Sequence, residues 1–194
     1  MPKQIIIPAV FIYYFVSDDS YFLNGINESL PDRSNNVSLL YYGNIYPVFS
    51  PAPDDVVIIS VRDVHKRYRL SGMAQLANCR VLLLLKCSVA VTTPQDGAFP
   101  WILPWRTDVG TLKSHIEKAH ASPFRRQLIS ERDRLIFNYL AEELSIPHLA
   151  FRVEKDKKYI YLLKRNRIIR LGLEGNSATT ILACRDIIRL SLIY

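Results

Sequence analysis

The first 120 positions alternate short apolar runs with segments whose apolar residues recur at helical spacing. The apolar runs are rich in β-branched and aromatic residues, which is typical of strands buried on both faces of a parallel sheet. They cover residues 10–16, 37–42, 55–61, 80–86 and 98–103. Helical patterns cover residues 21–30, 64–78, where Asp63 is an N-cap, and 107–119. This alternation predicts a doubly wound α/β domain over residues 1–121.

From residue 129 to residue 194 the pattern is helical, which predicts an all-α domain of about four helices after a linker at 122–128. The apolar positions fall into two sets on either side of a break at Ile146-Pro147, where Ser145 is a natural N-cap and Pro147 suits a first turn. The first set is Leu135, Ile136, Tyr139 and Leu140, and the second is Leu149, Ala150 and Val153.

A third helix is expected from about Asp156 to Gly172, where a left-handed cap is suited to glycine. Its inward positions are Ile160, Leu163, Ile168 and Leu171, and its outward positions are Lys157, Lys158, Tyr161, Lys164 and Arg165. Two helices that are joined by a tight turn, the second of them basic, predict a helix-turn-helix.

The last segment, residues 177–194, has a broader apolar face than the core of a small helix-turn-helix needs. Its apolar positions are Ile181, Leu182, Cys184, Ile187, Ile188 and Leu192. Two explanations remain open. Part of this face packs on the helical unit itself, or part of it faces a second subunit.

Charge is unevenly distributed along the chain, whose net charge is +7. Residues 126–194 carry 13 Lys and Arg against 8 Asp and Glu, whereas residues 1–125 carry 12 against 10. A compact basic unit favours a polyanionic partner, nucleic acid before membrane, and a solvated basic face is the alternative.

Cysteine usage and the N-terminal pattern indicate a cytoplasmic protein without a membrane anchor. Cys79, Cys87 and Cys184 have no metal-ligand spacing and lie in apolar surroundings, so we expect reduced, buried thiols and no bound cofactor or metal. The apolar run before Asp18-Asp19 contains Pro8 and precedes no cleavage site for a signal peptide. No catalytic constellation appears, and His148 is expected to be an ordinary surface residue rather than a ligand or base.

Residues 130–173 match, without a gap, the LuxR-type helix-turn-helix pattern. The matching positions are Ser130, Asp133, Ile136, Leu140, Ala141, Ser145, Leu149, Ala150, Val153, Lys158, Ile160, Leu171 and Gly172. An α/β domain followed by this unit resembles the NarL/FixJ group of response regulators. The resemblance implies a receiver-like domain that is joined to a DNA-binding output domain.

The acidic pair Asp18-Asp19 resembles the Mg²⁺-binding carboxylates of a receiver domain, although such a pair also serves as a helix cap. Ser60 stands where the resemblance places the phosphoacceptor Asp, and the usual Lys position falls near Trp105. A hydroxyl group does not replace a carboxylate as acyl-phosphate acceptor. The chain therefore resembles the atypical, phosphorylation-independent members of the group, the RcsA-type auxiliary regulators and the fimbrial or capsular regulators.

The segment from Tyr159 to Asn166 resembles the recognition helix of that subgroup, with departures at Tyr159, Leu163, Glu143 and Arg167. The resemblance makes Tyr161, Leu162 and Arg165 candidates for reading bases, with Arg165 on guanine and Leu162 on a thymine methyl group. Packing is the alternative for Tyr161. The candidates for phosphate contacts are Lys155, Lys157, Lys158 and Lys164, of which one or two are expected to be solvated only.

The expected function is sequence-specific binding of promoter DNA by a non-enzymatic transcriptional regulator. It is expected to pair with a second copy or with another LuxR-type regulator, because one such unit reads a half-site. The departures motivate an alternative, a co-regulator that binds a partner response regulator and touches DNA weakly. Trp101 and Trp105 offer either an exposed contact surface or core filling.

Overall fold

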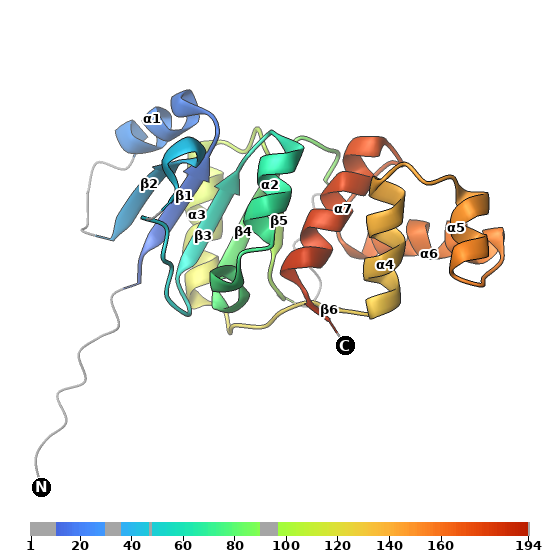
Figure 1. The fold of residues 1–194 in the computed structure, drawn as a ribbon. Coiled ribbons are helices and arrows are strands. Elements are labelled where there is room, and N and C mark those ends of the chain that lie inside the picture. Colours follow the sequence, from blue (N-terminus) through green and yellow to red (C-terminus); the bar gives the residue numbers. More distant parts are fainter. Residues whose placement is uncertain (1–10, 30–35, 47, 90–96, 194) are drawn as a thin grey trace, which may run out of the picture.

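The computed structural model describes residues 11–29, 36–46, 48–89 and 97–193. The chain has an α/β half and a helical half that lie side by side (Figure 1). Residue 10, where the first strand was expected to begin, and residue 30, where the first helix was expected to end, lie outside the described residues. No described helix is long and apolar enough to span a membrane.

Five parallel strands form the sheet, in the order β2-β1-β3-β4-β5. They are β1 (Tyr13–Ser17), β2 (Val37–Tyr41), β3 (Val56–Ser60), β4 (Arg80–Leu85) and β5 (Trp101–Pro104). All residues of β3 and β4 are buried, which their uninterrupted apolar sequences predict. This strand order confirms the doubly wound fold, and its topological switch point lies between β1 and β3, where Ser17 pairs with Ser60.

Helices cover both faces of the sheet. On one face α1 (Ser20–Ser29) and α3 (Val109–Ala121) pack through Leu23, Ile26, Leu112 and Ala119. The other face carries α2 (Val64–Ser71). As predicted, Asp63 caps the N-terminus of α2, because its carboxylate accepts hydrogen bonds from the His65 and Lys66 amides. The expected single helix at 64–78 is wrong in extent, because α2 ends before Gly72 and a separate 3-10 helix (Ala74–Asn78) follows.

The helical half contains α4 (Glu131–Ala141), α5 (Ile146–Arg152), α6 (Lys157–Arg170) and α7 (Ala178–Leu190). The first three form a helix-turn-helix unit with a small core of Ile136, Leu149, Ala150 and Ile160. Leu135, assigned to the apolar stripe of α4, is exposed, and Phe137 is buried in its place because α4 has a second buried side that faces α7.

Helix α7 belongs to both halves of the molecule. Its buried residues Cys184, Ile187 and Ile188 share one hydrophobic cluster with Val81 and Leu83 of the sheet. Figure 1 shows α7 between α2 and α4, beside the sheet. The connection between β4 and β5 contains no helix among its described residues, 86–89 and 97–100. The broad apolar face of α7 is thus largely covered within the chain, by α4 and by the α/β half.

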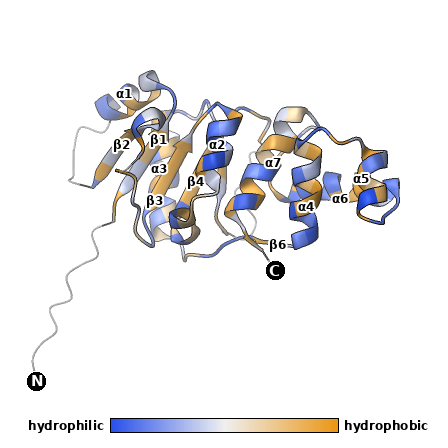
Figure 2. Cartoon of the chain, viewed as in Figure 1, coloured by the Kyte–Doolittle hydropathy of each residue, from blue (hydrophilic) through white to orange (hydrophobic). Residues whose placement is uncertain are grey.

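The predicted linker at 122–128 is held by hydrogen bonds on both sides. The Phe99 amide donates to the Arg125 carbonyl (2.7 Å), and the Gln127 amide donates to the Phe99 carbonyl (2.9 Å). The Arg126 guanidinium donates to the Leu190 carbonyl (2.7 Å). At the end of this segment, β6 (Leu128–Ile129) pairs with β7 (Leu192–Ile193) near the C-terminus. Figure 2, coloured by hydropathy, shows hydrophobic residues along the strands and both hydrophilic and hydrophobic residues along α4–α7.

Candidate nucleic-acid interface

Helix α6 has well-defined ends, and the buried Ile160 and Ile168 determine which of its sides faces outward. The Asp156 carboxylate accepts a hydrogen bond from the Tyr159 amide (2.6 Å) at the N-terminus. At the C-terminus Gly172 adopts a left-handed conformation (φ 71°), and the Leu173 amide donates to the Ile168 carbonyl (3.0 Å). The expected extent of the helix and its glycine cap are therefore confirmed.

The turns before α5 and α6 also contain a residue with a left-handed backbone, but that residue is glutamate and not glycine. Glu143 and Glu154 have left-handed backbones (φ 59° and 53°) after α4 and α5. The Leu144 amide donates to the Tyr139 carbonyl (3.1 Å), which closes the first of these caps. Glu143 replaces the glycine of the LuxR-type pattern at a position where glycine would be free of strain.

The structure places six of the seven predicted DNA-binding residues on the exposed surface of α6 and the turn before it. Those six are Lys155, Lys157, Lys158, Tyr161, Leu162 and Arg165. Within the described part of the chain, none of the four cations among them forms an ion pair. Lys164 differs, because it is half-buried at the side of the helix with its Nζ 5.6 Å from the centroid of the Tyr161 ring.

Arg167 points inward, where the LuxR-type pattern has an aliphatic residue. Its guanidinium forms an ion pair with the Asp133 carboxylate of α4, and both side chains are largely buried. This pair joins α6 to α4, so the Arg167 charge is not available to an outside partner. The sequence does not indicate that these two residues form a pair, since 34 positions separate them.

The carboxyl edge of the sheet holds Asp18 and Asp19 at the topological switch point. The Asp18 carboxylate accepts the backbone amides of Arg62 (3.0 Å) and Asp63 (2.9 Å). The Asp19 carboxylate caps α1 by accepting the Tyr21 amide (2.9 Å), and it forms an ion pair with the Arg62 guanidinium. Both carboxylates therefore have hydrogen-bond partners within the chain. Asp19 serves as a helix cap, which is the predicted alternative to a Mg²⁺-binding role.

Ser60 lies next to this pair at the end of β3 and is buried. The Ser17 hydroxyl donates to the Ser60 carbonyl (2.8 Å), which joins β1 and β3 at the switch point. Trp105, after β5, is half-buried, and the Arg62 guanidinium lies 4.4 Å from its ring centroid. Trp101 fills the core and stacks on Phe99, so core filling is the outcome for this tryptophan.

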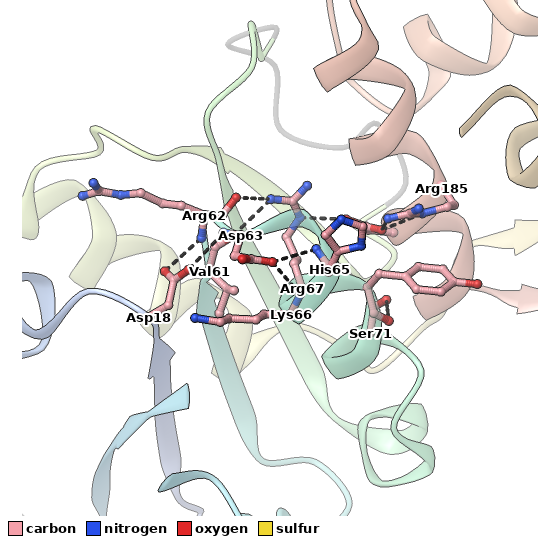
Figure 3. A network of polar contacts seen from close by, with 11 residues as sticks. Asp18, Val61, Arg62, Asp63, His65, Lys66, Arg67, Ser71 and Arg185 are labelled. Atoms are coloured by element: carbon pink, nitrogen blue, oxygen red, sulfur yellow. Dashed lines mark hydrogen bonds and ion pairs between the residues drawn. The ribbon is translucent and has the colours of Figure 1, made fainter. Parts of the chain in front are cut away.

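A buried charge network connects the two halves. Arg67 of α2 donates from Nε to the Asp186 carboxylate of α7 (2.7 Å), and Arg185 donates to the other oxygen of the same carboxylate (2.9 Å). Arg67 also donates to the Val61 carbonyl (3.1 Å), which Figure 3 shows together with the neighbouring bonds of Asp63. Burial raises the pKa of Asp186, and the attraction of Arg67 and Arg185 opposes that rise.

The remaining candidates lie outside these sites. His148 is exposed on α5, in agreement with its expected role as a surface residue. The three cysteines are free thiols, and Cys79 and Cys184 are buried as predicted, whereas Cys87 is only half-buried. Burial raises the pKa of Cys79 and of Cys184 to about 12, so both thiols stay protonated near neutral pH. No group of three metal-ligating side chains occurs among the described residues.

Neither a protein-family model nor a curated protein matches this chain. Among solved structures, RcsB from Salmonella enterica serovar Typhimurium bound to promoter P1flhDC is 13% identical, with a TM-score of 0.44 over 90% of this chain and 98% of that chain. The response regulator ChrA of a heme-sensing two-component system is 16% identical, with a TM-score of 0.30 over 93% and 99%. The strand order and the helix-turn-helix of the chain itself define its fold.

Proposed function

We propose that this protein is a DNA-binding transcriptional regulator whose α6 enters the major groove of promoter DNA. The observation that carries the proposal is the unpaired charge on the outer side of the helix-turn-helix. Lys155, Lys157, Lys158 and Arg165 are exposed and make no ion pair within the described residues. Lysines that surround a helix in the groove contact phosphates, and an arginine on its outer face contacts a base edge.

In this proposal the α/β half works without phosphate. Ser60 offers a buried hydroxyl group where a carboxylate would be needed, and the Arg62 guanidinium supplies the positive charge beside Asp19. A chain that accepts no phosphoryl group should remain unlabelled by acetyl phosphate. Labelling that Asp18→Ala or Asp19→Ala removes would revive the competing view, a phosphorylated response regulator.

The proposal includes a dimer, because one helix-turn-helix of this kind reads only a half-site. The partner is a second copy or another LuxR-type regulator. Since α7 is largely covered within the chain, the pairing surface lies elsewhere, and the exposed Leu128 of β6 and Leu192 of β7 are the first positions to change. Mass measurement in solution with and without DNA tests the dimer.

The test of the DNA-binding proposal is a binding titration with fluorescent promoter duplexes over a series of salt concentrations. Affinity should fall steeply with salt, because each neutralised phosphate releases counterions. Arg165→Ala should weaken binding by about 1–3 kcal/mol, the typical value of one bidentate base contact. Failure to bind any duplex, with or without a partner regulator, would refute the proposal.

A second candidate function is a co-regulator that acts by binding a partner protein. The observation in its favour is that Tyr161, Leu162 and Ile169 leave apolar surface exposed on α6. The same titration separates the two functions. A co-regulator of this kind would strengthen or weaken the binding of its partner to DNA while it shows no salt-dependent binding of its own.

A further inference from the structure

The outer side of α6 carries large apolar side chains that the chain leaves uncovered. Tyr161, Leu162 and Ile169 are 54%, 49% and 61% exposed. They share one side of the helix with Arg165, because residues three, four and seven positions apart lie on the same face. Such a stripe of exposed apolar surface usually marks a binding surface.

The stripe borders a shallow groove of about 550 Å³ between α6 and residues 173–176. Ile169 lines this groove together with the buried Ile168 and Leu173. The turn that forms its far wall is held in place, because the Glu174 amide donates to the Ser88 carbonyl of the α/β half (2.9 Å). The groove is therefore a preformed part of the fold.

The charges around the stripe indicate a polyanion as its occupant. Lys155, Lys157 and Lys158 are exposed at the N-terminal end of α6, and Arg165 lies within the stripe. Glu174 is the one acidic residue that lines the groove, and it lies beyond the opposite end of the helix. Duplex DNA is a polyanion that also presents apolar groups to a helix in its major groove. These groups are the C5-methyl groups of thymine.

We infer that this protein recognises its half-site largely through thymine methyl groups, an inference that rests on the proposed DNA-binding function. Leu162 and Ile169 are seven residues apart, which is about 10 Å along a helix. Since successive base pairs are about 3.4 Å apart along the duplex, this distance spans about three base pairs of DNA. Leu162 and Ile169 therefore contact two thymines about three base pairs apart, and Arg165 between them donates to a guanine. Ile169 is thus a specificity-determining residue of the reading surface.

The test begins with selection of bound duplexes from a library of random sequence by the full-length protein. Each thymine of a selected duplex is then replaced by deoxyuridine, which removes only the methyl group. Two positions about three base pairs apart should each lose about four-fold in affinity, because burial of one methyl group contributes about 0.8 kcal/mol.

Leu162→Ala should abolish the deoxyuridine effect at one position, and Ile169→Ala should abolish it at the other. Val48→Ala removes an exposed apolar side chain from the α/β half, far from α6 in the sequence, and should leave both effects unchanged. A selected duplex that shows no loss at any thymine would overturn the inference while DNA binding itself stands.

Selection of no duplex at any salt concentration would overturn the proposed function and the inference together. In that case, binding of a synthetic acidic amphipathic peptide that Ile169→Ala weakens would identify the groove as a protein-docking site instead.

Discussion

The outer face of α6 and the carboxyl edge of the sheet are both rich in charge, but they use it differently. At the sheet edge Asp18 and Asp19 are satisfied by backbone amides and by the Arg62 guanidinium. On α6, Lys158 and Arg165 are exposed and form no ion pair within the described residues. Charges that the fold has paired stabilise the fold, whereas charges that it leaves free attract a partner.

The largest effect is expected from the buried pair that joins the two halves. Asp186→Ala leaves the Arg67 guanidinium buried without its counter-charge, which should lower the free energy of unfolding by about 3–5 kcal/mol. Urea denaturation measures this loss. Glu131→Ala, which removes an exposed ion pair with Arg134, should cost far less stability than Asp186→Ala.

Joint replacement of the pair provides the control for that experiment. The double variant Arg67→Met/Asp186→Leu should recover part of the lost stability, because apolar side chains of similar volume often replace a buried ion pair without loss, whereas Arg185 still lacks its partner. An Asp186→Ala variant as stable as the parent would show that the two halves do not depend on this contact.

The next prediction crosses the two regions directly. Asp18→Ala removes a carboxylate that accepts two backbone amides, so unfolding free energy should fall by about 1.5–3 kcal/mol while DNA affinity stays the same. Lys158→Ala should leave stability unchanged within about 0.5 kcal/mol and should reduce the slope of log affinity against log salt by about 0.9. Equal effects of both variants on DNA binding would contradict the proposed difference between the paired charges of the sheet edge and the free charges of α6.

Stability should decrease at alkaline pH because of the thiols in the cores. The folded protein keeps Cys79 and Cys184 protonated up to a pKa of about 12, whereas unfolded thiols ionise from about pH 8.5. The contribution is therefore fully present below pH 8.5 and is lost as pH rises, by about 1.4 kcal/mol per pH unit for each thiol. Urea titrations between about pH 9 and 10 should show a shallower decrease for Cys184→Ala than for the parent, and an unchanged decrease would contradict the assignment.

The smallest effect concerns the turns that orient α6. Glu154→Gly should stabilise the protein by about 1 kcal/mol, because glycine adopts the left-handed backbone without strain. It should also raise the affinity for duplex DNA, since it removes a negative charge beside Lys155. Glu142→Gly is the matched control at a position with negative φ (−86°), and it should not stabilise. Thermal unfolding measures both variants.

Local patterns predict most of this fold, and distant pairings explain what they miss. The uninterrupted apolar sequence of β4 and the cap Asp63 follow from neighbouring residues alone, and Ser145 stands at the N-cap of α5 as predicted, although its side chain makes no cap hydrogen bond. The Arg67–Asp186 pair joins residues 119 positions apart, and no periodicity indicates which buried cation meets which carboxylate. For the same reason, the sequence shows that α7 has more apolar residues than the core of the helical half needs, but it does not show that these residues also pack on the α/β half.

The candidate site shows the same division. The outward cations of α6 follow from helical spacing, since the buried Ile160 and Ile168 fix the opposite side. The half-buried position of Lys164 and the ion pair of Arg167 with Asp133 depend on the packing of α6 against its neighbours, which spacing alone does not specify.

The most direct test of the central claim compares the salt dependence of DNA binding in the parent protein and in Lys155→Ala/Lys157→Ala/Lys158→Ala. The account predicts tight binding at low salt that weakens steeply with salt, and a slope that the triple variant reduces by about 2.7, with folding unaffected. Absence of binding at the lowest salt concentration, or a slope that the triple variant leaves unchanged, would contradict it.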